Sequence, residues 1–265
     1  MRTWIIGAAA ALAALAAPSI AAAQATGYVD LGYVNSNLEQ FGTDTDVDTI
    51  VASGSVAFDM GTGLGVQLDA RVGNAEPDSG SDIDFWGLGG HVYTRQGDWL
   101  FGGYAGFGNI EATGSDIDEW TAALEAQYYL ARTTIDGAVS FSETDGGGGT
   151  DIETTALDVG VRHFVTDNFS IGGNVGFANV DTGAGGDADA TSIGVEAEWQ
   201  MATLPISIFG GYQRTEVDIP GDLEVDSFGI GVRYNWGGTL FDRDRSGAGL
   251  RRRPGGIARI LGGVV

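Results

Sequence analysis

The sequence predicts an all-β protein, a transmembrane antiparallel up-and-down β-barrel of about 12 strands. Apolar residues alternate with small or polar ones in segment after segment, as in strands that have a different solvent on each face. The connections between these segments alternate between short and long, which is the connectivity of membrane-crossing hairpins. Beyond the N-terminus, no segment approaches the roughly 18 consecutive apolar residues of a spanning helix, so any span must consist of strands.

The clearest strand is residues 225–236, which read VDSFGIGVRYNW. An apolar residue stands at every second position from Phe228 onward, ending in Tyr234 and Trp236, and the positions between are small or polar. Aromatic rings suit a membrane boundary, and the opposite face carries Arg233, which a hydrocarbon core would not accept unpaired. We therefore interpret this segment as the closing strand of the barrel.

The N-terminus reads MRTWIIGAAAALAALAAPSIAAAQA, in which Arg2 precedes an apolar run and a series of small residues. This is typical of a secretory signal peptide. We expect residues 1–23 to be the signal peptide, with cleavage after residue 23 or 25, and the mature chain to be exported to the outer membrane. The alternative is a retained membrane helix, which Pro18 and the following Ala-x-Ala sites disfavour.

Composition excludes several functional classes. The net charge is −23, and all 13 cations are arginine; an acidic body repels nucleic acid, so we expect no nucleic-acid partner. There is no cysteine, which excludes disulfides, thiolate zinc sites and thiol nucleophiles. The 45 glycines and a mean hydropathy of +0.03 do not suit a large dry core, but a barrel with lipid outside and water inside needs none.

The barrel is predicted over residues 26–236, followed by a Gly/Arg-rich periplasmic tail over residues 237–265. A repeat of about 35 residues, one hairpin each, supports this register. A soluble sandwich or propeller would also repeat hairpins, but its strands would not all share an acidic long-loop end and an aromatic short-turn end. Short periplasmic turns are expected at 60–63, 95–98, 131–133, 166–168 and 201–204, and long external loops at 39–46, 75–81, 112–116, 144–151, 181–189 and 218–223.

Inward positions carry the function of such a barrel, because the outer face meets only lipid. Inward glycines favour an open, narrow lumen, and an excess of carboxylates would concentrate cations there. One interpretation is that Arg71, Arg162 and Arg233 only brace the wall by pairing with Asp69, Asp158 and Glu196; the other is that the same residues also line a conducting path. The predicted lumen-lining residues are Asp30, Asp69, Arg71, Glu125, Asp136, Asp158, Arg162, Glu196, Glu198 and Arg233.

The external loops are rich in Asp and Gly, for example TDTDVD from Thr43. Flexible clusters of carboxylates can bind calcium, but this segment lacks the glycine and the later glutamate of an EF-hand loop. We therefore expect no dedicated metal site. Bridging to lipopolysaccharide by divalent ions and simple solvation both remain open.

An enzyme is not expected. The only histidines are His91, which points inward, and His163, near the periplasmic rim, and neither has a serine nucleophile motif beside it. The tail has two interpretations. It is a disordered periplasmic segment, or residues 251–253, all arginine, enter the acidic lumen and gate it.

The segment from Gly229 to Trp236 resembles the C-terminal assembly signal of outer-membrane barrels of Gram-negative bacteria, and Gly231, Tyr234 and Trp236 match its pattern. The chain as a whole resembles the porin-like proteins of that membrane. The resemblance implies contact with the lipid bilayer, lipopolysaccharide and the outer-membrane assembly machinery, and passive diffusion of small hydrophilic solutes without a cofactor. We expect a narrow, cation-preferring channel; the alternative is a non-conducting structural or adhesive barrel that acts through its acidic loops.

Overall fold

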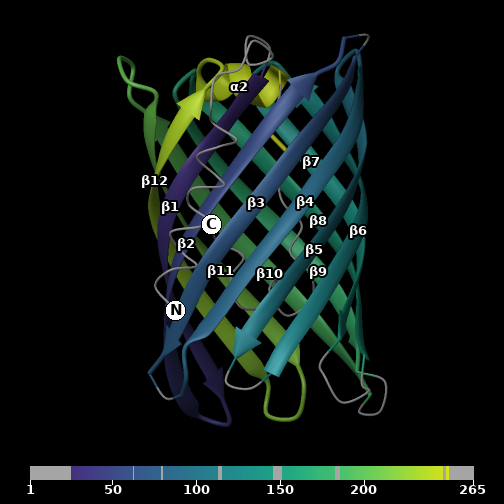
Figure 1. Ribbon diagram of the computed structural model, residues 1–265, viewed down its shortest axis with the longest axis vertical. Helices are drawn as coiled ribbons and strands as arrows, with labels where there is room; N and C mark the ends of the chain where they lie inside the picture. The colour runs from purple at the N-terminus through teal and green to yellow at the C-terminus, as the bar shows by residue number, and fades with distance from the viewer. Residues whose placement is uncertain are drawn as a thin grey trace.

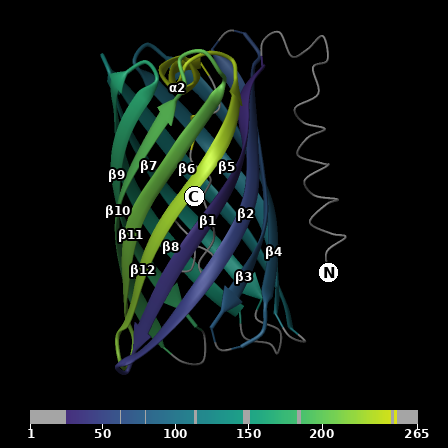
Figure 2. The same ribbon diagram turned by 90° about the vertical axis from the view of Figure 1, so that its left-hand side faces the viewer.

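The computed structural model describes residues 25–61, 63–78, 80–112, 115–145, 151–182, 186–246 and 249–250. Twelve antiparallel strands close into one barrel, each paired with its neighbours in sequence and the last with the first (Figures 1 and 2). The predicted twelve-stranded barrel is confirmed. Its strands are β1 (Ala25–Gln40), β2 (Thr43–Asp59), β3 (Leu64–Pro77), β4 (Ile83–Gln96), β5 (Trp99–Ala112), β6 (Ser115–Leu130), β7 (Thr133–Asp145), β8 (Asp151–Thr166), β9 (Phe169–Asp181), β10 (Asp187–Gln200), β11 (Ile206–Asp218) and β12 (Leu223–Trp236).

The barrel closes between β1 and β12, whose pairing runs from Gly27 opposite Trp236 to Gln40 opposite Leu223. The beginning of β1 and the end of β12 therefore lie at the same rim of the barrel, which we call the short-turn end. The opposite rim is the loop end. Figure 2 shows the two strands side by side along the length of the wall. The predicted signal peptide, residues 1–23, lies outside the described residues.

Alternation places apolar side chains outside and polar ones inside. Along β10, Ile193 and Val195 are 60% and 59% exposed, whereas Ser192 on the opposite face of the strand is buried inside the barrel. Burial of the polar face and exposure of the apolar face is the reverse of a soluble protein and suits lipid. Aromatic side chains near the short-turn end also point outward, among them Trp99, Tyr128, Trp199 and Tyr234.

The strands extend further at the loop end than the sequence predicted. They contain 13 to 17 residues, more than the roughly 9–11 that a membrane-crossing strand needs. The acidic segment from Thr43 belongs to β2, and only Phe41 and Gly42 separate it from β1. Hydrogen bonds between side chains on the outer face, such as Asn37 to Asp46 at 2.8 Å, accompany the pairing. Because these strand ends are polar on the outside, no apolar alternation marks them.

Several inward glycines lie beneath aromatic rings from the same or the neighbouring strand. The ring of Phe85 covers Gly73, the ring of Phe209 covers Gly231, and Tyr104 lies over two glycines, Gly89 and Gly106. A ring laid over a glycine in this way fills the space that the missing side chain leaves. The expectation that inward glycines leave the lumen open is therefore wrong at these positions.

Gly231 provides a stability test of this packing at the closing seam. A Cβ at this position would meet the Phe209 ring and would lie 2.7 Å from the backbone oxygen of Leu31. Since the backbone cannot move aside cheaply, we expect Gly231→Ala to lower the free energy of unfolding by about 1–3 kcal/mol. The control is Gly137→Ala, where the nearest atom would lie at an ordinary 3.5 Å. Urea titration of both variants in lipid vesicles measures the difference, and equal losses would contradict it.

After β12 the chain turns back into the mouth of the barrel. Gly237 and Gly238 have φ values of +93° and +112°, a region that favours glycine. The helix α2 (Leu240–Ser246) follows and lies across the short-turn end in both views (Figures 1 and 2). Thr239 and Asp242 cap it reciprocally: each backbone N–H donates to the other residue's side chain, at 3.0 and 3.1 Å.

The tail therefore differs from the expected disordered segment over residues 240–246, where it is helical and partly buried. The three arginines at 251–253, which the alternative interpretation of the tail places in the lumen, lie outside the described residues. No helix in the described part of the chain has the length and apolar character needed to cross a membrane.

Candidate functional site on the inner wall

The structure places every predicted lumen-lining residue on the inner face of its strand, where acids outnumber arginines. Asp30, Asp69, Glu125 and Asp136 are buried, and the others are half-buried. Their part in conduction stays a prediction. They are Asp30 on β1, Asp69 and Arg71 on β3, Glu125 on β6, Asp136 on β7, Asp158 and Arg162 on β8, Glu196 and Glu198 on β10, and Arg233 on β12.

His91 on β4 lies between two of these carboxylates. Its Nε2 is 2.8 Å from Asp69 Oδ2 and its Nδ1 is 2.7 Å from Glu125 Oε1, and the ring is completely buried. Gln67 donates to the other oxygen of Asp69 at 3.0 Å. An ionised carboxylate only accepts hydrogen bonds, so this geometry makes both ring nitrogens donors and the ring an imidazolium. The result is a buried charge cluster that links β3, β4 and β6.

Arg233 forms a second cluster across the closing seam. Its Nε and Nη2 donate to Asp30 Oδ2 at 2.9 and 2.7 Å, and its Nη1 donates to Glu198 Oε2 at 2.7 Å. The guanidinium carbon also lies 4.0 Å from the centre of the Tyr28 ring and 4.6 Å from that of Phe209. Arginine suits this position because its planar group can stack and donate in several directions at once. One side chain thus joins β1, β10 and β12.

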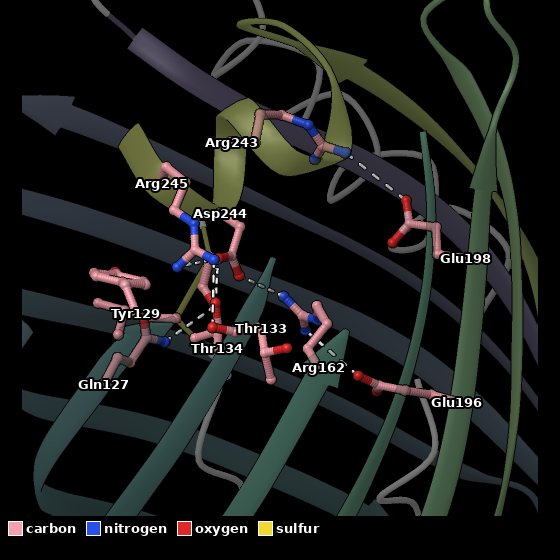
Figure 3. A network of polar contacts seen from close by, with 12 residues as sticks. Gln127, Tyr129, Thr133, Thr134, Arg162, Glu196, Glu198, Arg243, Asp244 and Arg245 are labelled. Carbon is pink, nitrogen blue, oxygen red and sulfur yellow. Dashed lines mark hydrogen bonds and ion pairs between the residues drawn. The ribbon is translucent and has the colours of Figure 1, made fainter. Parts of the chain in front are cut away.

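The helix α2 contributes a third cluster, centred on Asp244 (Figure 3). The Asp244 carboxylate accepts from the Thr134 hydroxyl at 2.6 Å and from Arg162 Nη1 at 3.3 Å, and it lies 3.6 Å from Arg245 Nη1. Arg162 also reaches Glu196 at 3.5 Å. Asp244 is therefore the shared partner through which the helix is joined to the inner wall at β7 and β8.

Arg243 points from α2 toward β10, where its Nη2 lies 3.8 Å from Glu198 (Figure 3) and 3.5 Å from Gln200 Oε1. Burial lowers the pKa of Arg243 to about 10, Glu198 opposes that shift, and the nearby Arg233 and Arg162 add to it. The side chain stays charged at neutral pH because its pKa remains well above 7. It is the least well compensated cation of this network.

The structure shows pairings that the sequence did not suggest. Asp69 pairs with His91, and Glu196 pairs with Arg162. Alternation assigns a residue to a face, but the partners within that face depend on strand register and on height in the barrel. Sequence reasoning also missed the roles of Arg243 and Asp244. The sequence did contain a signal for this helix. The charges alternate in FDRDRS, and the first aspartate of this run completes a Thr-x-x-Asp helix-capping pattern that begins at Thr239.

The three residues of the assembly-signal pattern occupy both faces of β12. Gly231 faces inward beneath Phe209. Tyr234 is 51% exposed on the outer face, with its ring 6.4 Å from that of Trp236. Trp236 in turn lies over Gly27 of β1, so it covers the seam from the outside. Their recognition by the assembly machinery stays a prediction.

The outer face at the loop end is acidic. Arg214 on β11 contacts three carboxylates there, those of Glu216, Glu224 and Asp226. Asparagine and aspartate pair across other strands, for example Asn179 with Asp189 at 3.1 Å. Within the described residues, no group of three or more His, Asp or Glu side chains is arranged to hold a metal ion.

A family model described as outer membrane protein beta-barrel domain matches residues 7–200. The chain belongs to this family. A solved outer-membrane channel from Pseudomonas putida F1 is 12% identical, with a TM-score of 0.57 over 80% of this chain and 95% of that one. The β domain of the Bordetella autotransporter BrkA is 11% identical, with a TM-score of 0.52 over 80% and 100% of the two chains. These identities show a shared fold alone. Comparison with curated proteins gives no match.

Proposed function

We propose that this outer-membrane barrel is a channel for the passive diffusion of small hydrophilic solutes, with a preference for cations. The observation that carries the proposal is the inner wall, where acids such as Asp158 and Glu196 outnumber arginines while the outer wall is apolar. A barrel that only contacted lipid would have no use for charged side chains in its interior. A polar interior bounded by a wall of low dielectric constant attracts ions of the opposite sign.

The inner-wall contacts also support a combined bracing and conducting role. Arg162 and Arg233 each join carboxylates from other strands, which fixes the positions of those carboxylates. Fixed charges along a passage select ions more sharply than mobile ones, because they need no reorganisation as an ion passes. The proposal involves no cofactor and no catalytic step.

Single-channel recording of the refolded protein in a planar bilayer tests this function. Under a salt gradient, we expect a stable conductance whose reversal potential shows cation preference. Asp158→Asn and Glu196→Gln should each reduce the cation permeability ratio by up to about fivefold, because one nearby unit charge is worth about 1 kcal/mol in water. Asp98→Asn, in an exposed turn, is the control of equal charge and should leave the ratio unchanged. Anion preference would contradict the proposal.

A second candidate is a structural or adhesive barrel that does not conduct. The exposed acids at the loop end favour it, since the strands continue beyond the length that a membrane needs and carry carboxylates such as Asp46 and Asp189 on the outside. Such a surface would contact lipopolysaccharide through divalent ions. A folded barrel that stays silent in the bilayer, and whose association with lipopolysaccharide is lost on chelation, would favour this function.

The proposal includes the route to the membrane. Residues 1–23 would direct export, and Gly231, Tyr234 and Trp236 would be recognised by the assembly machinery as β12 closes the barrel. The short-turn end would then face the periplasm and the loop end the exterior, as in bacterial outer-membrane barrels.

A further inference from the structure

The described residues after β12 contact several strands of the wall at the short-turn end. The chain leaves β12 at Trp236, and its helix α2 contacts β7, β8 and β10 through Asp244 and Arg243. Arg245 then reaches the backbone oxygen of Leu130 on β6 at 2.9 Å. Leu250 contacts β3, which is three strands from β12 around the closed barrel.

Leu250 is seated against the wall at β3, β4 and β5. It is 5% exposed and packs with Tyr93 and Leu100 in a small apolar cluster. The Gln67 side chain holds its backbone on both sides: Gln67 Nε2 donates to the Leu250 oxygen at 3.0 Å, and the Leu250 N–H donates to Gln67 Oε1 at 3.3 Å. The wall therefore holds the chain at Leu250 as well as at α2.

The helix α2 depends on the barrel wall for its structure. The helix α2 has seven residues, too few to be stable alone in water. Arg243 and Arg245 stand near the wall arginine Arg162, and Asp244 is the acid of α2 that faces this group (Figure 3). The Asp244 carboxylate contacts Arg162 of the wall and Arg245 of the helix, while Glu198 and Glu196 remain partners of Arg243 and Arg162. Loss of the Asp244 carboxylate would therefore weaken the attraction of the helix to the wall at β7 and β8.

We propose that the helix α2 (Leu240–Ser246) is a gate that closes the periplasmic mouth of the channel, and that Asp244 is the latch that holds it on the inner wall. This inference rests on the proposed channel function, because a gate needs a conducting path. Release would swing the helix about the glycines at 237 and 238 into the periplasm. The barrel itself need not change, since β12 ends before the gate begins.

Conductance measures the state of the gate. Removal of residues 239–265, which leaves all twelve strands, should raise the single-channel conductance several-fold. Asp244→Asn in the full chain should raise the fraction of time spent in that higher level by at least about tenfold, because losing one partner of a buried ion pair leaves the other charges uncompensated. Asp98→Asn is again the control, and circular dichroism verifies the fold of each variant. Conductance equal in the full and shortened chains would overturn the gate while leaving the channel in place.

A chemical readout separates the gate from the channel. The natural chain has no cysteine, so Leu250→Cys provides a single thiol that reacts with a small water-soluble maleimide only when residue 250 leaves its site. In the Leu250→Cys background, Asp244→Asn should increase the labelling rate at least about tenfold, whereas Asp98→Asn should not. Unchanged labelling would overturn the latch. Faster labelling in a barrel that never conducts, even when shortened, would overturn both the gate and the proposed function.

Discussion

Replacement of Arg233 by methionine is expected to lower the free energy of unfolding by about 3–5 kcal/mol. The side chain bonds to Asp30 and Glu198, and Asp30 is buried. Methionine fills a similar volume but leaves buried Asp30 without its cation, and leaves Glu198 with only the longer contact to Arg243 at 3.8 Å. Because β1 and β12 close the barrel, the loss falls on the pairing that completes the fold.

Arg214 provides a matched control for this experiment. It contacts three carboxylates, one more than Arg233, but it lies on the outer face at the loop end, where its side chain is 36% exposed. Water and salt screen such pairs, so Arg214→Met should change stability by no more than the error of the measurement. Urea titration in lipid vesicles measures both variants. Similar losses for the two would mean that the number of partners, and not burial, sets the effect.

Arg233→Lys distinguishes charge from shape at the same site. Lysine keeps the positive charge but cannot stack flat against Tyr28 and Phe209 while donating to Asp30 and Glu198. We expect it to recover less than half of the stability that methionine loses. Full recovery would show that a point charge is sufficient, and that the two ring contacts at 4.0 and 4.6 Å contribute little.

The sequence contained enough information to predict the barrel, because each strand has two faces in different solvents. In β12, the alternation from Phe228 to Trp236 fixes the outward side, and the structure exposes Phe228 by 56% and Tyr234 by 51%. The same signal fails at the loop end. There β2 begins at Thr43 with carboxylates on the outside, so the hydrophobic contrast that reveals a strand is missing although the backbone pairing continues.

The inner-wall residues were predictable as a set, but their partners were not. Asp69 meets His91, 22 positions away, and Asp244 meets Thr134, 110 positions away. The alternation of residues along the sequence does not indicate such contacts, since they depend on register, on the tilt of the strands and on where the chain goes after the barrel closes. The tail shows the same limit most clearly: its composition resembles a disordered segment, and the wall supplies the charges that order it.

His91→Leu is expected to destabilise the barrel by about 3–5 kcal/mol. The carboxylates of Asp69 and Glu125 are each 1% exposed and lie on either side of the imidazole. Leucine removes the cation between them and leaves two buried like charges that repel each other. The matched control is His163→Leu at the rim, where the ring is exposed and is bonded to Thr133 at 2.9 Å; that change should have little effect.

The triple variant His91→Leu, Asp69→Asn and Glu125→Gln decides whether the loss comes from charge or from packing. If uncompensated carboxylates cause it, neutralising both should restore most of the lost stability, because the remaining amides carry no net charge to desolvate. If the leucine fits the space poorly, the triple variant should be no more stable than the single one. Urea unfolding of the unchanged protein, His91→Leu, His163→Leu and the triple variant, measured in the same vesicles, separates these causes. Recovery in the triple variant would mean that the polar centre of this barrel is kept for its charges, since a neutral interior would be about equally stable.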